Sequence, residues 1–222
     1  MSPRIIVTGT DTGIGKTVFA AGLTRQLDGV YFKPVQAGVD TETDTAVVQR
    51  LSGLPAPRML PEIWQLTTPA SPHLAAERDG VMIDPTRLTL PTLDRPLIVE
   101  GAGGLMVPLT RDLLYIDVFA TWRAPVVLCT RTSLGTLNHT LLSLLALQRR
   151  RIPVLWIAFI GEAHADNERT LKEMGGVPIL GRLPHLKPLT PHTLKAAFDT
   201  SFRLESFIAG EQLTRDLTHE QP

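Results

Sequence analysis

Short apolar runs alternate along the chain with segments in which apolar residues recur at helical spacing. None of the runs alternates with polar residues, which is typical of parallel strands covered on both faces. The predicted strands are residues 5–8, 30–32, 97–99, 126–129, 154–159 and 179–180. The predicted helices are residues 17–27, 44–51, 116–122, 137–148, 167–174 and 191–208. This order predicts an α/β fold with a mostly parallel sheet flanked by helices on both faces.

One stretch departs from the alternation. Residues 54–96 hold eight of the chain's 18 prolines, so we expect no long regular element there, although a short helix at 74–78 fits the pattern. A long irregular excursion of this kind within a compact domain is usually functional or disordered. With 222 residues, the chain predicts a single domain over residues 1–210 and a polar C-terminal tail over 211–222.

Composition narrows the possible functions. The chain has 22 basic and 22 acidic residues, and this neutral balance argues against binding to nucleic acid or to an anionic membrane. A single cysteine, Cys129, excludes a disulfide framework and a cysteine-based zinc site. No apolar run reaches about 18 residues and no signal-peptide pattern opens the chain. We therefore expect a soluble cytoplasmic protein.

The most informative segment is the sequence Gly-Thr-Asp-Thr-Gly-Ile-Gly-Lys-Thr at residues 9–17, called the phosphate-binding loop below. It follows a predicted strand and opens a predicted helix, where backbone N–H groups can surround a phosphate chain. Lys16 would reach the β- and γ-phosphates, and the Thr17 hydroxyl would bind Mg²⁺. Five residues separate Gly9 from Gly15, one more than in the usual motif. The sequence predicts a P-loop NTPase-like domain.

Two carboxylates are candidates to hold the magnesium ion. Glu100 ends the apolar run 97–99 and precedes a glycine-rich segment, and Asp44 stands at the start of a predicted helix. Asp44 read alone is as well explained as a helix N-cap. Lys33 ends the run 30–32 and would be a second cation at the phosphates. Read alone, it is better explained as a surface lysine.

Five motifs occur in a particular order, and together they resemble dethiobiotin synthetases. They are residues 8–17, Lys-Pro-Val at 33–35, Ser-Pro-His at 71–73, Glu-Gly-Ala-Gly-Gly at 100–104 and Leu-Gly-Thr-Leu-Asn-His at 134–139. The resemblance covers residues 4–210, and the longer loop is that family's own form. It implies a homodimeric enzyme that closes a ureido ring on 7,8-diaminononanoate with CO₂ and ATP or another nucleoside triphosphate.

The resemblance also implies roles for individual residues. Lys33, Lys16 and Thr12 would act on the carbamate and phosphate oxygens, and Thr17, Asp44 and Glu100 would hold Mg²⁺. The implied nucleotide-binding set comprises Gly13, Ile14, Gly15, Lys16, Thr17, Val18, Asp44, Glu100, Gly101, Ala102, Gly103, Pro184, His185 and Leu186. The implied substrate-binding set comprises Lys33, Ala37, Gly135, Thr136, Leu137 and Asn138, the last four from the neighbouring subunit.

Residues 137–148 carry leucines all around the predicted helix, so we expect this helix to be buried on most sides, as a dimer interface would achieve. Two positions depart from the family pattern. Ala37 replaces a Ser or Thr, which removes a substrate hydrogen bond of about 1 kcal/mol. Phe159 and Ile160 replace an Asn-Asp pair that reads adenine, which predicts a relaxed or altered nucleotide preference.

Three other functions agree less well with the sequence. A P-loop ATPase dimer switch of the partitioning or positioning type carries a signature lysine where this chain has Asp11. A cobyrinate synthase-type amidotransferase needs a glutaminase domain for which 222 residues leave no room. A relative that has lost catalysis is hinted at only by Ala37 and Phe159.

Overall fold

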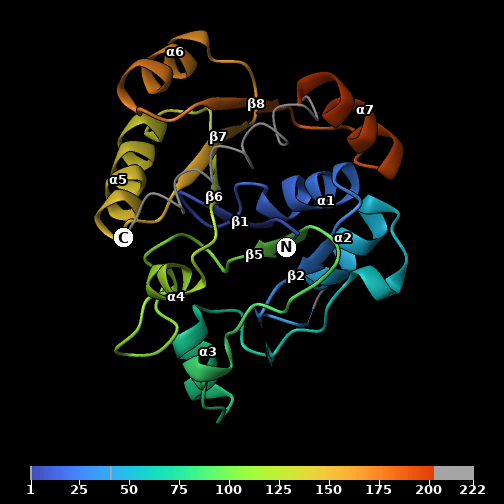
Figure 1. The fold of residues 1–222 in the computed structure, drawn as a ribbon, viewed down its shortest axis with the longest axis vertical. Helices are drawn as coiled ribbons and strands as arrows, with labels where there is room; N and C mark the ends of the chain where they lie inside the picture. Colours follow the sequence, from blue (N-terminus) through green and yellow to red (C-terminus); the bar gives the residue numbers. More distant parts are fainter. Residues whose placement is uncertain (1, 41, 203–222) are drawn as a thin grey trace.

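A computed structural model describes residues 2–40 and 42–202. Its main sheet has six parallel strands in the order β2-β5-β1-β6-β7-β8 (Figure 1). The strands are β1 (Arg4–Gly9), β2 (Val30–Phe32), β5 (Leu97–Glu100), β6 (Val126–Arg131), β7 (Val154–Ile160) and β8 (Ile179–Leu183). All six coincide with the predicted apolar runs, and nearly every residue of the first five is buried. The predicted α/β fold is confirmed.

Helices cover both faces of this sheet (Figure 1). Helices α1 (Lys16–Gln26), α2 (Asp44–Ser52) and α7 (Pro191–Ser201) pack against one another on one face. Helices α4 (Tyr115–Trp122), α5 (Thr136–Arg149) and α6 (Ala165–Met174) lie on the other. Each face has its own hydrophobic core. Successive residues of each strand point to opposite faces, so a purely apolar strand can contribute to both cores at once.

The register of the central strands places the loop at one edge of the sheet. β1 pairs in parallel with β5, where Val7 lies opposite Glu100, and with β6, where Gly9 lies opposite Cys129. The carboxyl ends of these strands therefore meet where the chain turns from β1 into α1. Ligands of open α/β sheets bind at this edge, in the crevice outside the carboxyl ends of the strands.

The proline-rich stretch contains only short elements, as predicted. They are the 3₁₀ turns η1 (Ala56–Arg58) and η2 (Pro85–Arg87), the strand β4 (Trp64–Leu66) and the helix α3 (Pro72–Arg78). The sequence analysis missed β4 and its parallel partner β3 (Val35–Ala37), which form a separate two-stranded sheet. Each of these strands has a glutamine as its middle residue, so neither forms the apolar run by which the other strands were predicted.

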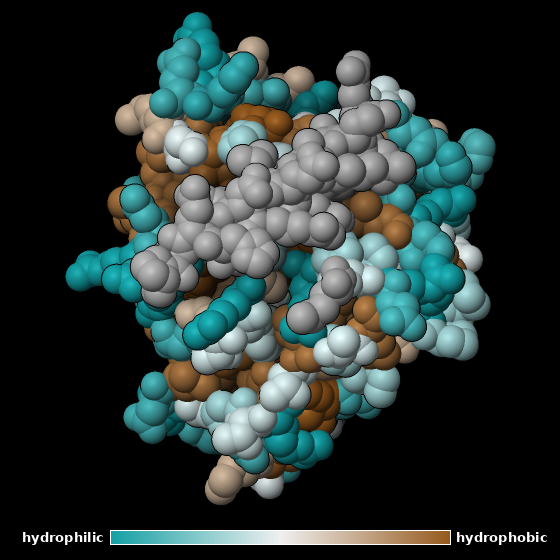
Figure 2. Space-filling view, in the orientation of Figure 1, coloured by the Kyte–Doolittle hydropathy of each residue, from teal (hydrophilic) through white to brown (hydrophobic). Residues whose placement is uncertain are grey.

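The C-terminal prediction is tested only in part. Helix α7 begins at Pro191, after an N-cap at Thr190 whose hydroxyl accepts from the Thr193 N–H, and it ends at Ser201. Residues 203–208 of the predicted helix and the tail at 211–222 lie outside the described residues. Within the described part, no helix has both the length and the hydropathy that a membrane span needs. On the face shown in Figure 2, hydrophilic residues are interspersed with hydrophobic ones.

The contact between α1 and α7 gives a test of this packing. A Cβ atom on Gly22 would stand 2.0 Å from Cε2 of Phe198. Helix propensity alone would make Gly22→Ala stabilising by about 1 kcal/mol. We expect the clash to prevail, lowering the free energy of unfolding in urea by about 1–3 kcal/mol. Adding Phe198→Leu should restore part of the loss, and a single variant as stable as the wild type would contradict this packing.

Candidate functional site

The turn from the phosphate-binding loop into α1 requires a glycine at position 15. Gly15 is the N-cap of α1 with φ of 95°, and a Cβ atom there would stand 2.9 Å from Cγ2 of Ile160. Lys16 is buried, and its Nζ donates to the Asp11 carbonyl at 2.9 Å. Helix α1 has no side-chain cap and no acidic residue in its first turn. Its N-terminal amides therefore stay available to an anion, at the positive end of the helix dipole.

Three oxygen atoms meet at the start of α1. The Thr17 hydroxyl lies 2.9 Å from Oδ1 of Asp44 and 2.9 Å from Oε1 of Glu100. The single hydroxyl proton can be donated to only one of the two carboxylates at a time, and both carboxylates also contact the ammonium group of Lys33. Hydroxyl and carboxylate oxygens are the ligands that Mg²⁺ prefers, together with water and phosphate oxygens. These three residues therefore fit a magnesium ion.

Lys33 is the cation closest to this cluster. Its Nζ lies 2.5 Å from Oδ2 of Asp44 and 3.2 Å from Oε1 of Glu100. Burial alone would lower the pKa of Lys33, but these two carboxylates outweigh burial and raise it above its ordinary value. The lysine is thus charged and buried, so the interpretation of Lys33 as a surface lysine is wrong. For Lys16, burial prevails and lowers its pKa.

Two residues that sequence reasoning missed hold the carboxylates in place. The buried Tyr31 hydroxyl donates to Oε2 of Glu100 at 2.8 Å. Oε1 of Gln36 accepts from the Asp44 N–H at 3.2 Å. The cap of α2 is Thr43 and not Asp44, because the Thr43 hydroxyl accepts from the Ala46 N–H. A signal for Tyr31 existed, since residues two apart in a strand share a face and Tyr31 precedes Lys33 by two.

The glycine-rich segment after β5 packs directly against the phosphate-binding loop. Gly103 has φ of 65°, and a Cβ atom there would stand 3.2 Å from Oγ1 of Thr12 and 2.8 Å from Cγ2 of Val107. A Cβ atom on Gly104 would stand 3.4 Å from the Gly9 carbonyl oxygen. A side chain at position 103 would be strained by the positive φ and would crowd Thr12 and Val107, whereas one at position 104 would make an ordinary contact with the loop.

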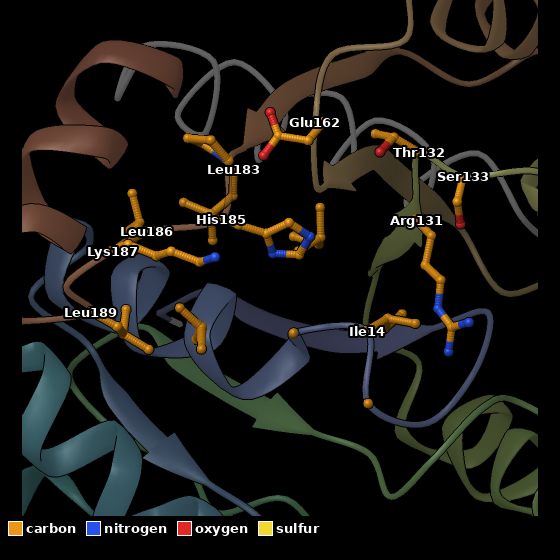
Figure 3. Close-up of a pocket in the computed structure, with 15 residues that line it drawn as sticks. Ile14, Arg131, Thr132, Ser133, Glu162, Leu183, His185, Leu186, Lys187 and Leu189 are labelled. Atoms are coloured by element: carbon orange, nitrogen blue, oxygen red, sulfur yellow. The ribbon is translucent and has the colours of Figure 1, made fainter.

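A cavity of about 840 Å³ lies over the loop (Figure 3). His185 and Lys187 point into it from the segment after β8, while Arg131 lies beside Ile14 at the loop. Of the residues expected to contact a nucleotide, the structure places seven in its wall: Gly13, Ile14, Gly15, Val18, Pro184, His185 and Leu186. Four other expected residues lie together outside this wall. Lys16 and Thr17 begin α1, and the carboxylates of Asp44 and Glu100 contact the Thr17 hydroxyl.

A second cavity of about 300 Å³ lies on the other side of the loop. Its polar wall comes from Thr10, Asp11 and Thr12, and its apolar wall comes from the segment after Gly104 and from α5. The two cavities therefore share the loop as a common wall. Lys33, Asp44 and Glu100 are not among the described residues that line either cavity.

Other expected site residues lie apart from both cavities. None of Gly135, Thr136, Leu137 and Asn138 is among the residues that line them, within the described part of the chain. Ala37 is half-buried on β3. Phe159 is fully buried in the core on the α5 side, whereas its neighbour Ile160 lines the first cavity. Only one of the two non-polar replacements can thus touch a nucleotide.

The fold and the loop define the class of this protein. A parallel sheet whose first strand turns through a Gly-Lys-Thr loop into a helix, with two carboxylates at the threonine, is a P-loop nucleoside-triphosphate-binding domain. A family model described as an AAA domain matches residues 3–193.

Three relatives carry the name ATP-dependent dethiobiotin synthetase BioD. The one from Rhodopseudomonas palustris (strain BisA53) is 67% identical over 207 residues, which cover 93% of this chain and 97% of the relative. The one from Nitrobacter hamburgensis is 61% identical and covers 95% of this chain and 99% of the relative. The one from Afipia carboxidovorans is 60% identical and covers 94% of this chain and 100% of the relative. The chain belongs to the dethiobiotin synthetase family, and the resemblance inferred from its motifs is confirmed.

Solved structures resemble the chain in fold alone. A Pyrococcus furiosus cell division ATPase MinD gives a TM-score of 0.54 at 17% identity and covers all of both chains. A ParA family ATPase from Chlorobium tepidum gives 0.52 at 14% identity, over 89% of this chain and 91% of its own.

The hydrogen bond from Tyr31 to Glu100 predicts that the hydroxyl of Tyr31 contributes more to the free energy of unfolding than the hydroxyl of Tyr115, which is also buried. Tyr31→Phe leaves a buried carboxylate oxygen without its donor, so we expect a loss of about 1–3 kcal/mol in the free energy of unfolding. The matched control is Tyr115→Phe, because the Tyr115 hydroxyl is buried and has no hydrogen-bond partner among the described residues. Urea titrations without metal would measure both. Equal losses in the two variants would refute the role of Tyr31.

Proposed function

We propose that this chain closes a ureido ring on 7,8-diaminononanoate with CO₂, at the expense of ATP, to form dethiobiotin. The observation that carries the proposal is Lys33, a buried and charged lysine that contacts the carboxylates of Asp44 and Glu100 beside the end of the phosphate-binding loop. The family membership supplies the substrate class. We infer roles for the site residues from this geometry.

The proposed reaction has three steps. One substrate amine attacks CO₂ and loses a proton to give a carbamate. A carbamate oxygen then attacks the γ-phosphorus and ADP leaves, which gives a carbamic–phosphoric anhydride. The second amine attacks the anhydride carbonyl carbon, phosphate leaves and the ring closes. Each intermediate is anionic, so positioned cations should provide most of the rate enhancement.

The buried cations are suited to this charge. Lys16 would contact phosphate oxygens and the carbamate from the loop, and Lys33 would stabilise the carbamate from the side of the carboxylates. Thr12 would line the carbamate side, because it lies in the wall of the second cavity. Thr17, Asp44 and Glu100 would hold Mg²⁺, which when bound neutralises charge on the phosphate oxygens.

The first cavity is the proposed nucleotide site, with Pro184, His185 and Leu186 toward the base. Ile160 there offers no side-chain hydrogen bond, so recognition of the base would depend on backbone groups and on neighbouring side chains. The names of the relatives support ATP as the nucleotide. A broader tolerance for other bases remains a prediction, because discrimination between bases depends on hydrogen bonds more than on shape.

We further propose a homodimer formed through α5. Leu142 and Leu145 on this helix are 57% and 59% exposed, and Leu134 just before it is fully exposed. Only the opposite side of α5, with Leu144 and Leu147, packs into the core of its own chain. Leu142 also lines the second cavity, together with the exposed Met106. A second copy would cover these side chains and bring its residues 135–138 to the substrate.

The activity predicts a reaction that depends on the diamine. Purified protein with 7,8-diaminononanoate, bicarbonate and Mg²⁺ should release phosphate from ATP and form dethiobiotin, identified by mass. Lys33→Met should lower kcat by about 10²–10³ because one charge-stabilising group is lost. Lys172→Met, an exposed lysine on α6, is the control that should leave the rate unchanged.

Parallel reactions with CTP, GTP and UTP would measure tolerance for the base. A preference for ATP above about a hundredfold would defeat the idea of relaxed recognition at Ile160. Phosphate release that is indifferent to the diamine would refute the proposed activity itself.

The dimer predicts that charge on the exposed face of α5 separates the subunits. We expect Leu142→Asp to shift the molecular mass in sedimentation equilibrium from two chains toward one, because it places a carboxylate in the proposed interface. Met82→Asp is the control, since Met82 is 88% exposed and lies in the loop between α3 and η2. A wild-type protein that sediments as one chain would contradict the proposal.

A further inference from the structure

One ion pair bridges the phosphate-binding loop to the neighbouring strand. Arg131 is the last residue of β6, and its Nη2 donates to Oδ2 of Asp11 at 2.9 Å and to the Thr12 carbonyl at 3.0 Å. Oδ1 of Asp11 accepts from the Thr12 N–H at 2.7 Å. Both carboxylate oxygens of Asp11 are therefore engaged, one within the loop and one by the guanidinium.

The pair lies between the two cavities. Arg131 lines the first cavity, whereas Asp11 and Thr12 line the second. The pair thus stands in the wall between the proposed nucleotide site and the cavity on its other side. The Asp11 carbonyl also receives the Lys16 ammonium, so one residue joins both cations to the loop.

Stability does not explain this pair. The side chains of Arg131 and Asp11 are 47% and 50% exposed. Ion pairs between such exposed groups contribute little to folding, because water screens them and both side chains lose freedom. A guanidinium that fixes both a side chain and a backbone carbonyl of one loop does, however, determine the shape of that loop.

The charge of Asp11 gives the guanidinium a second role. A carboxylate on this loop repels any polyphosphate that binds there and any anion formed in the second cavity. Lys16 is engaged by the Asp11 carbonyl and not by its carboxylate. Among the described residues, Arg131 is the one cation that forms an ion pair with Asp11.

We propose that Arg131 is a positioning residue that neutralises Asp11 and holds residues 11 and 12 in the conformation that receives the triphosphate. The inference rests on the proposed function only for the identity of the nucleotide. Arg131 acts here through Asp11 and not by direct contact with phosphate. Replacing the arginine should therefore weaken nucleotide binding, and removing the charge of Asp11 as well should restore it.

The experiment is a double-mutant cycle read by calorimetry. It measures the Kd of a non-hydrolysable ATP analogue with Mg²⁺ for the wild type, Arg131→Ala, Asp11→Asn and the double variant. We expect Arg131→Ala to raise the Kd about tenfold, since an unpaired carboxylate near the phosphates costs on the order of 1.4 kcal/mol. In the Asp11→Asn background the same change should raise the Kd less than about threefold.

Controls separate this effect from a general loss of structure. Arg169→Ala breaks an exposed pair with Asp166 on α6 and should leave the Kd unchanged. The defect of Arg131→Ala should shrink as salt rises, because repulsion between exposed charges is screened. Thermal unfolding of all variants should stay within a few degrees of the wild type.

Two outcomes would overturn the inference. A Kd unaffected by Arg131→Ala would show that the pair does not serve the loop. An equal loss with and without Asp11 would show that the guanidinium contacts phosphate directly. Because binding is measured without the diamine, a wild type that binds the analogue but makes no dethiobiotin would refute the proposed function and leave this test intact.

Discussion

A fully buried carboxylate, that of Glu100, is the constraint on which the rest of the site depends. A charge at the end of a central strand is costly to bury unless donors surround it. Its three donors come from two parts of the chain: the hydroxyl of Tyr31 and the ammonium of Lys33 belong to β2 and the residue after it, and the hydroxyl of Thr17 belongs to α1. The strand order and the loop must therefore be correct together before Glu100 is satisfied.

The site contains charged side chains before any substrate binds. The carboxylates of Asp44 and Glu100 raise the pKa of Lys33 despite its burial, and Lys33 in turn lowers the pKa of Asp44, so this lysine and this aspartate keep their charges inside the protein. Such a group needs little rearrangement when anionic substrates bind, and preorganised charge is the main source of catalysis in reactions of this type.

Most of the fold could be predicted from the sequence, because hydrophobic runs and the loop motif are local features of the chain. All six strands of the main sheet and the loop's position follow from residues read in order. The small sheet of β3 and β4 was not predicted, since each strand has a glutamine in its middle and does not form an apolar run. Tyr31 and Arg131 escaped for a different reason: each acts on a residue far along the chain, Glu100 and Asp11. Such contacts depend on strand order, which a single sequence does not display.

Three contacts fix the shape of the loop, and they explain why charge alone would not make this site. Ile160 packs over Gly15 on the nucleotide side, Gly103 lies against Thr12 on the other side, and Arg131 holds Asp11 between them. A lysine on a mobile loop would lose much of its advantage, because a misplacement of about 1 Å can cost two orders of magnitude in rate. The apolar residue at position 160 thus has a structural role, because it packs against the glycine at the start of α1 whether or not it contacts a nucleotide base.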